Sequence, residues 1–388
     1  MPRSLRYIIL VAVTAAVVYG ASRALDEREA ATTEVAGALV FPELGTDINA
    51  VTRIKGLNEE GPYTLVKKDA SWLLVERGNF LADTAKVNEL LVGMVQLKLL
   101  EKKTAKAERY AKLGLTEPGK KGSDAHQILL EDASGNAKAS IILGESKAAR
   151  GEPNMSEVYM RLPGDPQTWA ALSSMPNVVS AVQWLSDELV KFDDKRIAEV
   201  LVTHADGETV RIVRTPGAGQ GYTLADVPQG RTVDSQYIVR NAATTLANLV
   251  LDDVMSAEQM PMEGKDAVDF SVKTFDGMQL DLKSIKAADE RRVHLSASLL
   301  SSPPVAPEAS EEAKGDHEIV MLTPEQVAAQ VTMFNRRWKG YTFELGDWRL
   351  APSYKRNAGF LAAEEDKGNA GDTPAQPTLP GASGATGG

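Results

Sequence analysis

The pattern closest to a known binding motif is a stretch rich in glycine and lysine at residues 114–121, GLTEPGKK. A phosphate-binding loop requires Ser or Thr after its lysine, a buried strand before it and a helix after it. Here Lys121 follows Lys120, and Gly122 comes next. The stretch therefore predicts a solvated turn. A second stretch, GAGQG at residues 217–221, lies between two expected strands and predicts a hairpin loop.

The titratable residues do not form local ligand or catalytic pairs. No two of the four histidines are closer than 23 residues, so the sequence lacks the short spacing of a helix-borne zinc site. Adjacent acids on a helix end or loop point in different directions, which favours solvated carboxylates over an acid–base pair. The histidines are His126, His204, His294 and His317, and the acid pairs are Asp193 and Asp194, Asp252 and Asp253, and Glu311 and Glu312.

The sequence also lacks two features that would support particular classes of reaction. The chain has no cysteine, which excludes thiol nucleophiles, disulfides and iron–sulfur clusters. It also lacks the G-x-S-x-G elbow of serine hydrolases. The sequence therefore predicts no catalytic residue, no cofactor and no metal site, and a protein that is not an enzyme.

A local excess of positive charge lies between Lys98 and Lys121, where eight basic residues accompany three acidic ones. Such runs are most often a solvated helix edge, and this interpretation is favoured. Anionic headgroups, a surface polymer or an acidic partner remain alternatives. The whole chain has a net charge of −10 at pH 7, which argues against a nucleic acid as partner.

Two regions predict amphipathic helices at corresponding places in the chain. Residues 83–105 place apolar side chains on one face behind a capping aspartate, Asp83. Residues 234–257 repeat the arrangement behind Asp234, at a separation of 151 residues. The apolar positions are Val87, Leu90, Leu91 and Met94 in the first and Ile238, Ala242, Leu246, Leu249 and Val250 in the second. The repetition predicts a duplicated α+β chain in which each helix lies across a sheet supplied by its own flanks.

Strand-like hairpins are expected around both helices, and Trp72 and Tyr222 hold corresponding places in them. Strands are predicted at residues 51–57, on both sides of a turn at 68–71 within 63–75, and at 126–131, 137–143 and 158–162, then at 197–203, 209–214, 268–274, 279–284 and 293–299. Helical spacing is also present at residues 107–115 and 178–192. Residues 301–315 are rich in Pro and Glu and predict a loop.

The clearest helix start is the sequence TPEQ at Thr323. It combines a threonine cap, proline at the first helical position and glutamine where a capping box requires it. The helix that follows should bury one face, formed by Val327, Val331, Phe334 and Trp338.

The run from Tyr7 to Ser22 carries no charge and predicts a membrane helix. A cleaved signal peptide is the main alternative, because the run has the length of an apolar signal core and ends in small residues. Arg3 and Arg6 before the run, against acids after it, place the N-terminus in the cytoplasm and the remaining chain outside, in the periplasm.

The predicted organisation has an α+β repeat on each side of residue 190. Residues 1–24 form the single-pass anchor, 25–40 a linker, 41–190 the first repeat, 191–357 the second repeat, and 358–388 a disordered tail that is poor in large apolar groups.

Several stretches of this layout resemble the bacterial family known as domain of unknown function 4340. They are FLADTAKV from Phe80, RYAKLGL from Arg109, YMRLPG from Tyr159 with Trp169 beyond it, and Trp184, Leu185 and Leu189. The resemblance extends roughly from Phe41 to Pro352. It implies one N-terminal membrane helix and an association with gliding-type ABC transporter components, and it supplies no catalytic residues.

Two functions follow as hypotheses. The first is a non-catalytic extracytoplasmic scaffold or accessory subunit of an ABC-type transport complex, with protein partners in that complex. The second is a protein that binds a cell-envelope glycan or lipid in a concave pocket lined by residues such as Trp72, Trp169 or Tyr222.

Overall fold

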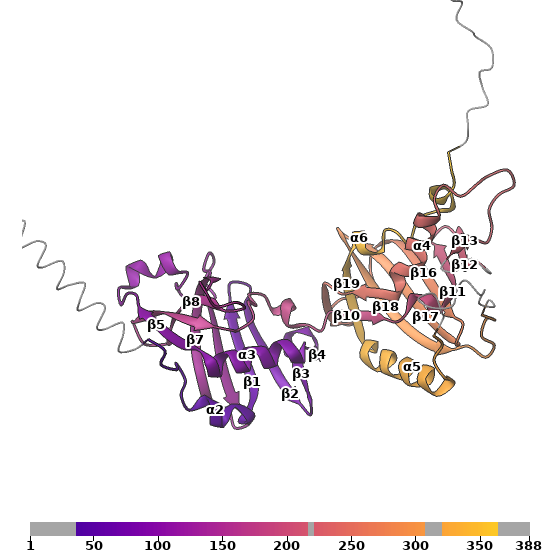
Figure 1. The fold of residues 1–388 in the computed structure, drawn as a ribbon. Helices are drawn as coiled ribbons and strands as arrows, with labels where there is room; N and C mark the ends of the chain where they lie inside the picture. Colours follow the sequence, from indigo (N-terminus) through magenta and orange to yellow (C-terminus); the bar gives the residue numbers. More distant parts are fainter. Residues whose placement is uncertain (1–35, 216–220, 307–319, 364–388) are drawn as a thin grey trace, which may run out of the picture.

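The computed structural model describes residues 36–215, 221–306 and 320–363. Two sheets of antiparallel strands, each carrying helices, lie side by side along the molecule (Figure 1). The α+β class predicted from the sequence is therefore confirmed. Within the described residues, no helix is long and apolar enough to cross a membrane. The predicted anchor, Tyr7 to Ser22, lies outside the described residues.

The first sheet has nine strands in the order β4-β3-β2-β1-β6-β7-β8-β9-β5. Its strands are β1 (Val51–Asn58), β2 (Gly61–Lys68), β3 (Ser71–Leu74), β4 (Phe80–Leu81), β5 (Lys98–Lys102), β6 (His126–Asp132), β7 (Ala137–Ala148), β8 (Ser156–Arg161) and β9 (Thr168–Ser173). Short helical segments flank them: α2 (Leu44–Asp47), η1 (Ile48–Ala50), η2 (Val75–Arg77) and η3 (Ala107–Leu113).

The second sheet has eight strands in the order β13-β12-β11-β16-β17-β18-β19-β15. Its strands are β11 (Ile197–His204), β12 (Thr209–Arg214), β13 (Tyr222–Leu224), β15 (Asp253–Ser256), β16 (Lys265–Thr274), β17 (Met278–Ala287), β18 (Glu290–Leu299) and β19 (Tyr341–Gly346). The short segments in this half are η5 (Asp194–Arg196), η6 (Thr245–Ala247), α6 (Asp347–Leu350) and η8 (Asn357–Phe360).

The two sheets share one strand order. If β4 is set aside, each strand of the first sheet corresponds to the strand with the same rank in the second, from β3 and β13 at one edge to β5 and β15 at the other. Both sheets also shift register at the start of the first hairpin strand, before Arg53 and before Glu199. Directly after that shift, Arg53 faces Glu131, whereas Glu199 faces Lys273. Corresponding positions therefore hold an ion pair with its signs reversed.

The first long helix, α3 (Thr84–Gln96), begins as predicted. The Asp83 carboxylate accepts hydrogen bonds from the amides of Ala85 and Lys86, at 2.9 and 3.1 Å. The predicted extension to residue 105 is wrong, because β5 follows the helix at once. Its backbone pairs with β9 on one side and with residues 37–40 on the other, and this pairing overrides the helical spacing.

The second helix, α4 (Gln236–Thr244), is shorter than predicted and starts one residue later. Its N-cap residue is Ser235, so the prediction that Asp234 caps it is wrong. The buried faces of the two helices show that the true offset between them is 152 residues and not 151. The buried residues of α3 are Val87, Leu90, Leu91 and Met94, and those 152 residues later are Val239, Ala242, Ala243 and Leu246. The same offset relates Asp83 to Ser235. Beyond η6 the chain forms β14 (Asn248–Val250) and not a further helical turn.

The segment that joins the halves is not the helix that its spacing predicted. It contains only η4 (Ala181–Trp184) and then β10 (Glu188–Lys191), which pairs with β14. The segment is held by the first half before it reaches the second: Asp83 donates its amide to the Trp184 carbonyl at 2.7 Å, and Ser186 donates to Leu81 at 3.0 Å. These edge hydrogen bonds favour an extended backbone.

Helix α5 (Pro324–Trp338) lies between β18 and β19 and confirms the strongest helix signal. Thr323 and Gln326 form the predicted capping box, and the four predicted face residues are buried. In the first half the corresponding connection, from β8 to β9, is a short turn. The second half is therefore enlarged at this connection, while the first half is enlarged between β5 and β6.

Both ends of the folded region extend past their predicted limits. Residues assigned to the linker 25–40 already pair with β5, since Gly37 donates to Leu99 at 2.8 Å and Val40 to Leu97 at 2.9 Å. At the other end Phe360 is fully buried, so the predicted tail 358–388 cannot begin at residue 358. Residues 364–388 lie outside the described part of the chain.

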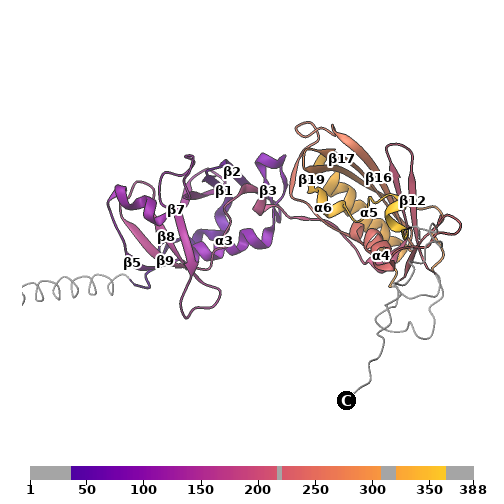
Figure 2. The same cartoon turned by 90° about the horizontal axis from the view of Figure 1, so that it is seen from above.

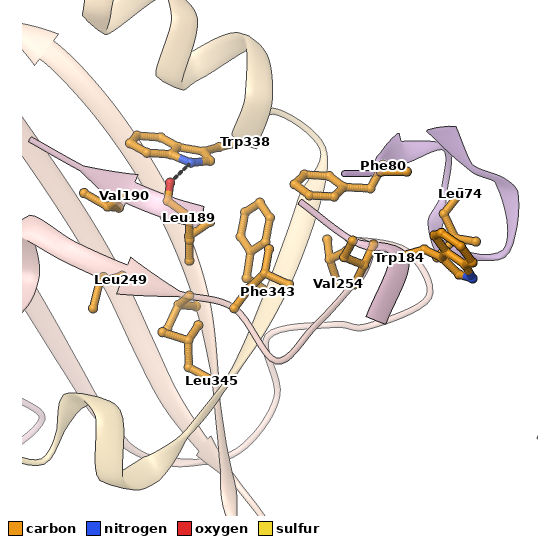
Figure 3. Packing of buried hydrophobic residues seen from close by; sticks show 14 of the residues in the cluster. Leu74, Phe80, Trp184, Leu189, Val190, Leu249, Val254, Trp338, Phe343 and Leu345 are labelled. Atoms are coloured by element: carbon orange, nitrogen blue, oxygen red, sulfur yellow. Dashed lines mark hydrogen bonds between the residues drawn. The ribbon is translucent and has the colours of Figure 1, made fainter. Parts of the chain in front are cut away.

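Most of the buried apolar side chains of the two halves form one continuous cluster. Figure 3 shows where they meet: Phe80 of β4 lies toward Phe343 of β19, and Trp338 donates a hydrogen bond from Nε1 to the Leu189 carbonyl at 3.1 Å. The connecting segment thus contributes to the core of the second half.

Candidate functional site

Residues 114–121 do not form a phosphate site. The helical turn η3 precedes them, and β6 is the next regular element after them. Leu115 is fully buried against Ala125 and Ile142 in a small cluster on the first sheet. The stretch is therefore a turn, as predicted, but it is not wholly solvated, because Leu115 anchors it in the core. The GAGQG stretch falls largely on residues 216–220, outside the described residues.

The histidines lie apart from one another. His126 begins β6, His204 ends β11, and the His294 Nε2 atom lies 2.8 Å from the Thr342 hydroxyl oxygen. His317 lies outside the described residues. In the described part of the chain, no three His, Asp or Glu residues gather as metal ligands.

Two of the paired acids, predicted to be solvated, form ion pairs with arginines. The Asp252 carboxylate binds Arg349 at 2.6 Å and accepts the Gly346 amide at 2.7 Å. Its neighbour Asp253 binds Arg77 of the first half at 2.6 Å. These two acids therefore hold structure together. Asp193 caps η5 through the Lys195 amide, and the pair Glu311 and Glu312 lies outside the described residues.

The three aromatic residues proposed for a shared pocket do not meet. Trp72 and Tyr222 are buried in the cores of different halves, at 2% and 1% exposure. The Tyr222 hydroxyl donates to the Asp194 carbonyl at 3.0 Å, and burial raises the pKa of this phenol. Trp169 is in β9, where the Lys102 ammonium lies 5.4 Å from its ring centre.

A cleft with a volume of about 670 Å³ lies elsewhere, at one end of the first sheet. Its walls come from the β1–β2 turn, the start of β6, the bend in β7 and the connecting segment. Hydrogen bonds fix these walls to one another: Gly122 donates to Glu59 at 2.7 Å, and Ser180 donates to Glu60 at 2.9 Å. A smaller pocket continues from it toward Trp184.

Four carboxylates line the cleft, and no lysine or arginine does: the acids are Glu59, Glu60, Asp124 and Glu145. A negative potential in a concave site repels anions and favours cationic or uncharged polar ligands. His126 also lines the cleft, and burial lowers its pKa to about 4, so its ring is neutral at pH 7. Sequence spacing gave no signal for this cleft, because its residues come from four separate segments.

The contact between the halves is a second candidate feature, here called the seam. On the first half it comprises Arg77, Gly78 and Phe80. On the second half it comprises Asp253, Tyr341 and Phe343. The Tyr341 hydroxyl donates to the Gly78 carbonyl at 2.9 Å, and the Phe80 ring packs edge-on against both aromatic rings, with centroids 5.1 and 5.6 Å apart. Figure 2 shows the two halves adjoining between β3 and β19.

Comparison with known protein families identifies the family of this chain. The family model of a domain of unknown function, DUF4340, matches residues 72–268, just over half of the chain, from β3 of the first sheet into β16 of the second. The chain therefore belongs to this family. No curated protein matches the sequence.

Proposed function

We propose that the protein is a non-catalytic extracytoplasmic scaffold or accessory subunit of an ABC-type transport complex. In this proposal the chain is held in the cytoplasmic membrane by the run from Tyr7 to Ser22. The observation that carries the proposal is the seam, which joins two sheets of one strand order into a single elongated body. Such a body presents two surfaces to partners at a fixed separation.

The shared strand order also supports an origin by duplication. The matched register shifts, the helix offset of 152 residues between Asp83 and Ser235, and the reversed ion pairs all relate equivalent positions. The two halves then diverged by enlargement at different connections. Their surfaces are no longer alike, so each half is suited to a different partner.

The direct test is affinity purification of the tagged full-length chain from native membranes. Co-purification of transporter subunits is the expected result. A matched variant, Phe80→Ala in the seam, should lose partners that need both halves. Tyr237→Ala serves as its control, because this α4 side chain is 75% exposed. A purified chain without any transporter subunit would contradict the proposal.

The location is tested separately by adding protease to spheroplasts. Because positive residues oppose translocation of the short N-terminus, the folded region should be digested and only a small N-terminal fragment spared. Protection of the full chain until lysis would contradict this topology. A mature N-terminus after Ser22 would show a cleaved signal and contradict the anchor.

A second function, binding of a cell-envelope glycan or lipid, is favoured by the cleft near His126. Its acidic lining suits an uncharged or cationic polar headgroup. Native mass spectrometry of the full chain should then detect a retained small molecule, and Glu145→Lys should release it. Retention by both proteins alike would exclude the cleft as the binding place.

A further inference from the structure

An exposed basic surface lies at the end of the first sheet farthest from the second sheet, where β5 is drawn in Figure 1. Five of its side chains are exposed and form no ion pair with any described residue. They are Lys98 and Lys102 of β5, Lys106, and Arg109 and Lys112 of η3. Within a chain of net charge −10, unpaired cations concentrated in one place create a local positive potential.

The geometry of η3 keeps these charges in place. The Tyr110 hydroxyl donates to the Pro166 carbonyl in the β8–β9 turn at 2.6 Å, and the Arg161 guanidinium lies 5.2 Å from the Tyr110 ring centre. At the base of η3, the Thr104 carbonyl accepts the Thr168 hydroxyl at 2.7 Å. The basic surface is therefore attached to the sheet and is not a loose loop.

Aromatic rings accompany the cations. Lys102 lies over Trp169, and both Lys103 and Lys147 lie over the Tyr159 ring, at 5.5 and 5.9 Å. Lys103 and Lys147 each also bind a glutamate, which lowers the net charge at those two positions. A mixture of amphipathic rings and ammonium groups is typical of surfaces that meet lipid headgroups.

The described chain begins beside this same surface. Leu39 pairs with Lys98, and the Gly37 amide donates to Leu99. Fourteen residues separate Ser22 from Gly37 in the sequence, and a chain of that length spans at most about 50 Å. A short tether raises the effective concentration of a weak surface contact.

We propose that this basic surface docks on an anionic lipid bilayer next to the anchor. This inference rests on the anchor in the proposed function, and it adds the face that meets the membrane. An acidic protein or a soluble polymer has no comparable reason to meet the chain at this end. Lys106, Arg109 and Lys112, the three cations around η3, should each strengthen binding to an anionic surface roughly fivefold. Their combined loss should therefore weaken docking about 100-fold.

The test uses the absence of cysteine from the chain. Ala111→Cys introduces a single label between Arg109 and Lys112, and Ala329→Cys places a matched label on α5 of the other half. Full-length protein is reconstituted in vesicles of phosphatidylcholine, alone or mixed with phosphatidylglycerol, that carry an energy-transfer acceptor in the headgroup region. Transfer from the Ala111 position should rise with phosphatidylglycerol and fall with added salt, and transfer from the Ala329 position should not.

A triple variant that combines Lys106→Gln, Arg109→Gln and Lys112→Gln should abolish the rise in energy transfer with phosphatidylglycerol. A control with the same charge change on the second half, Lys265→Gln, Lys283→Gln, Lys339→Gln, should retain it. Transfer that is indifferent to phosphatidylglycerol would overturn the proposal. Binding of a soluble polyanion without approach to anionic vesicles would assign the surface to an acidic polymer and also overturn it. Neither result depends on transporter subunits, so failure here is distinct from failure of the scaffold proposal.

Discussion

His126 is a residue whose protonation couples folding to pH. Its folded-state pKa is about 4, against 6.5 for an ordinary histidine, because burial disfavours the charged ring. Between these values the unfolded chain takes up a proton and the folded chain does not. Stability is therefore fully present above pH 6.5 and falls as pH is lowered toward 4, by at most about 3 kcal/mol.

The substitution His126→Gln should remove this component of the pH dependence. Chemical denaturation of the two proteins between pH 7 and pH 4.5 measures it. The wild-type free energy of unfolding should drop more steeply than that of the variant. Parallel curves would show that the imidazole is not the responsible group.

A buried ion pair gives the second prediction at this scale. The Asp276 carboxylate and the Arg196 guanidinium are almost fully buried, and two hydrogen bonds of 2.6 and 3.1 Å join them. Burial alone would raise the pKa of Asp276, but Arg196, Thr274 and the Leu322 amide together lower it. The charge is therefore retained in the folded state.

Removing one partner of such a pair leaves an uncompensated buried charge. Asp276→Asn should cost about 3–5 kcal/mol of unfolding free energy. The matched control is Asp206→Asn, which breaks a bridge to Arg356 that is half exposed on both sides and should cost less than about 1 kcal/mol. Equal losses in urea denaturation would contradict the argument.

At the scale of the element, the two corresponding helices differ in their caps. Asp83 accepts two backbone amides, whereas the Ser235 side chain makes no capping hydrogen bond. Asp83→Ala should therefore cost about 1 kcal/mol. Ser235→Ala should change stability by no more than about 0.5 kcal/mol. Thermal denaturation of both variants measures the difference, and a larger loss for Ser235→Ala would reverse this interpretation.

The sequence predicted elements well where local signals agreed. The capping box at Thr323 and hairpins such as those at residues 197–214 and 268–284 are specified by neighbouring residues, and they are found as predicted. Local spacing failed at β5, β14 and β10, since each of these strands is fixed by a partner far away in the sequence. The helix offset was misjudged by one residue because the prediction aligned two aspartates, Asp83 and Asp234, whereas Ser235 is about as good an N-cap residue and holds that position.

The cleft and the basic surface were even harder to predict from the sequence than the helices and strands. The cleft near His126 combines turns from β1, β6 and β7 with the connecting segment, and no spacing rule relates these segments. The basic run was visible in the sequence, but the usual behaviour of charge runs favoured a solvated helix edge. In the structure it follows a strand and a short η3 turn, beside the start of the described chain.

At the scale of the whole molecule, the seam should make the two halves unfold together. Phe80 is 2% exposed and contacts two aromatic rings of the other half, and the Arg337 guanidinium lies 5.7 Å from its ring centre. Phe80→Ala should cost about 3–5 kcal/mol. A single calorimetric transition of the full chain should separate into two.

The exposed α4 residue Tyr237 again supplies the control, since Tyr237→Ala should leave the transition single. A wild-type protein that already unfolds in two well-separated steps would contradict the coupling. Phe80→Leu returns apolar volume without an aromatic ring. If it restores the single transition, the coupling between the halves depends on packing and not on the aromatic edge contact.

The hydrogen bonds that hold the connecting segment also have a mechanical consequence. Because the chain between the halves is fastened first to Leu81 and Asp83 and then to β14, it offers no free length to act as a hinge. A load applied to the second half is transmitted through the backbone and the seam to the first sheet and its edge strand β5, beside which the described chain begins. The molecule would then act as a strut of constant length, and anything bound to its second sheet would be held at a constant distance from β5.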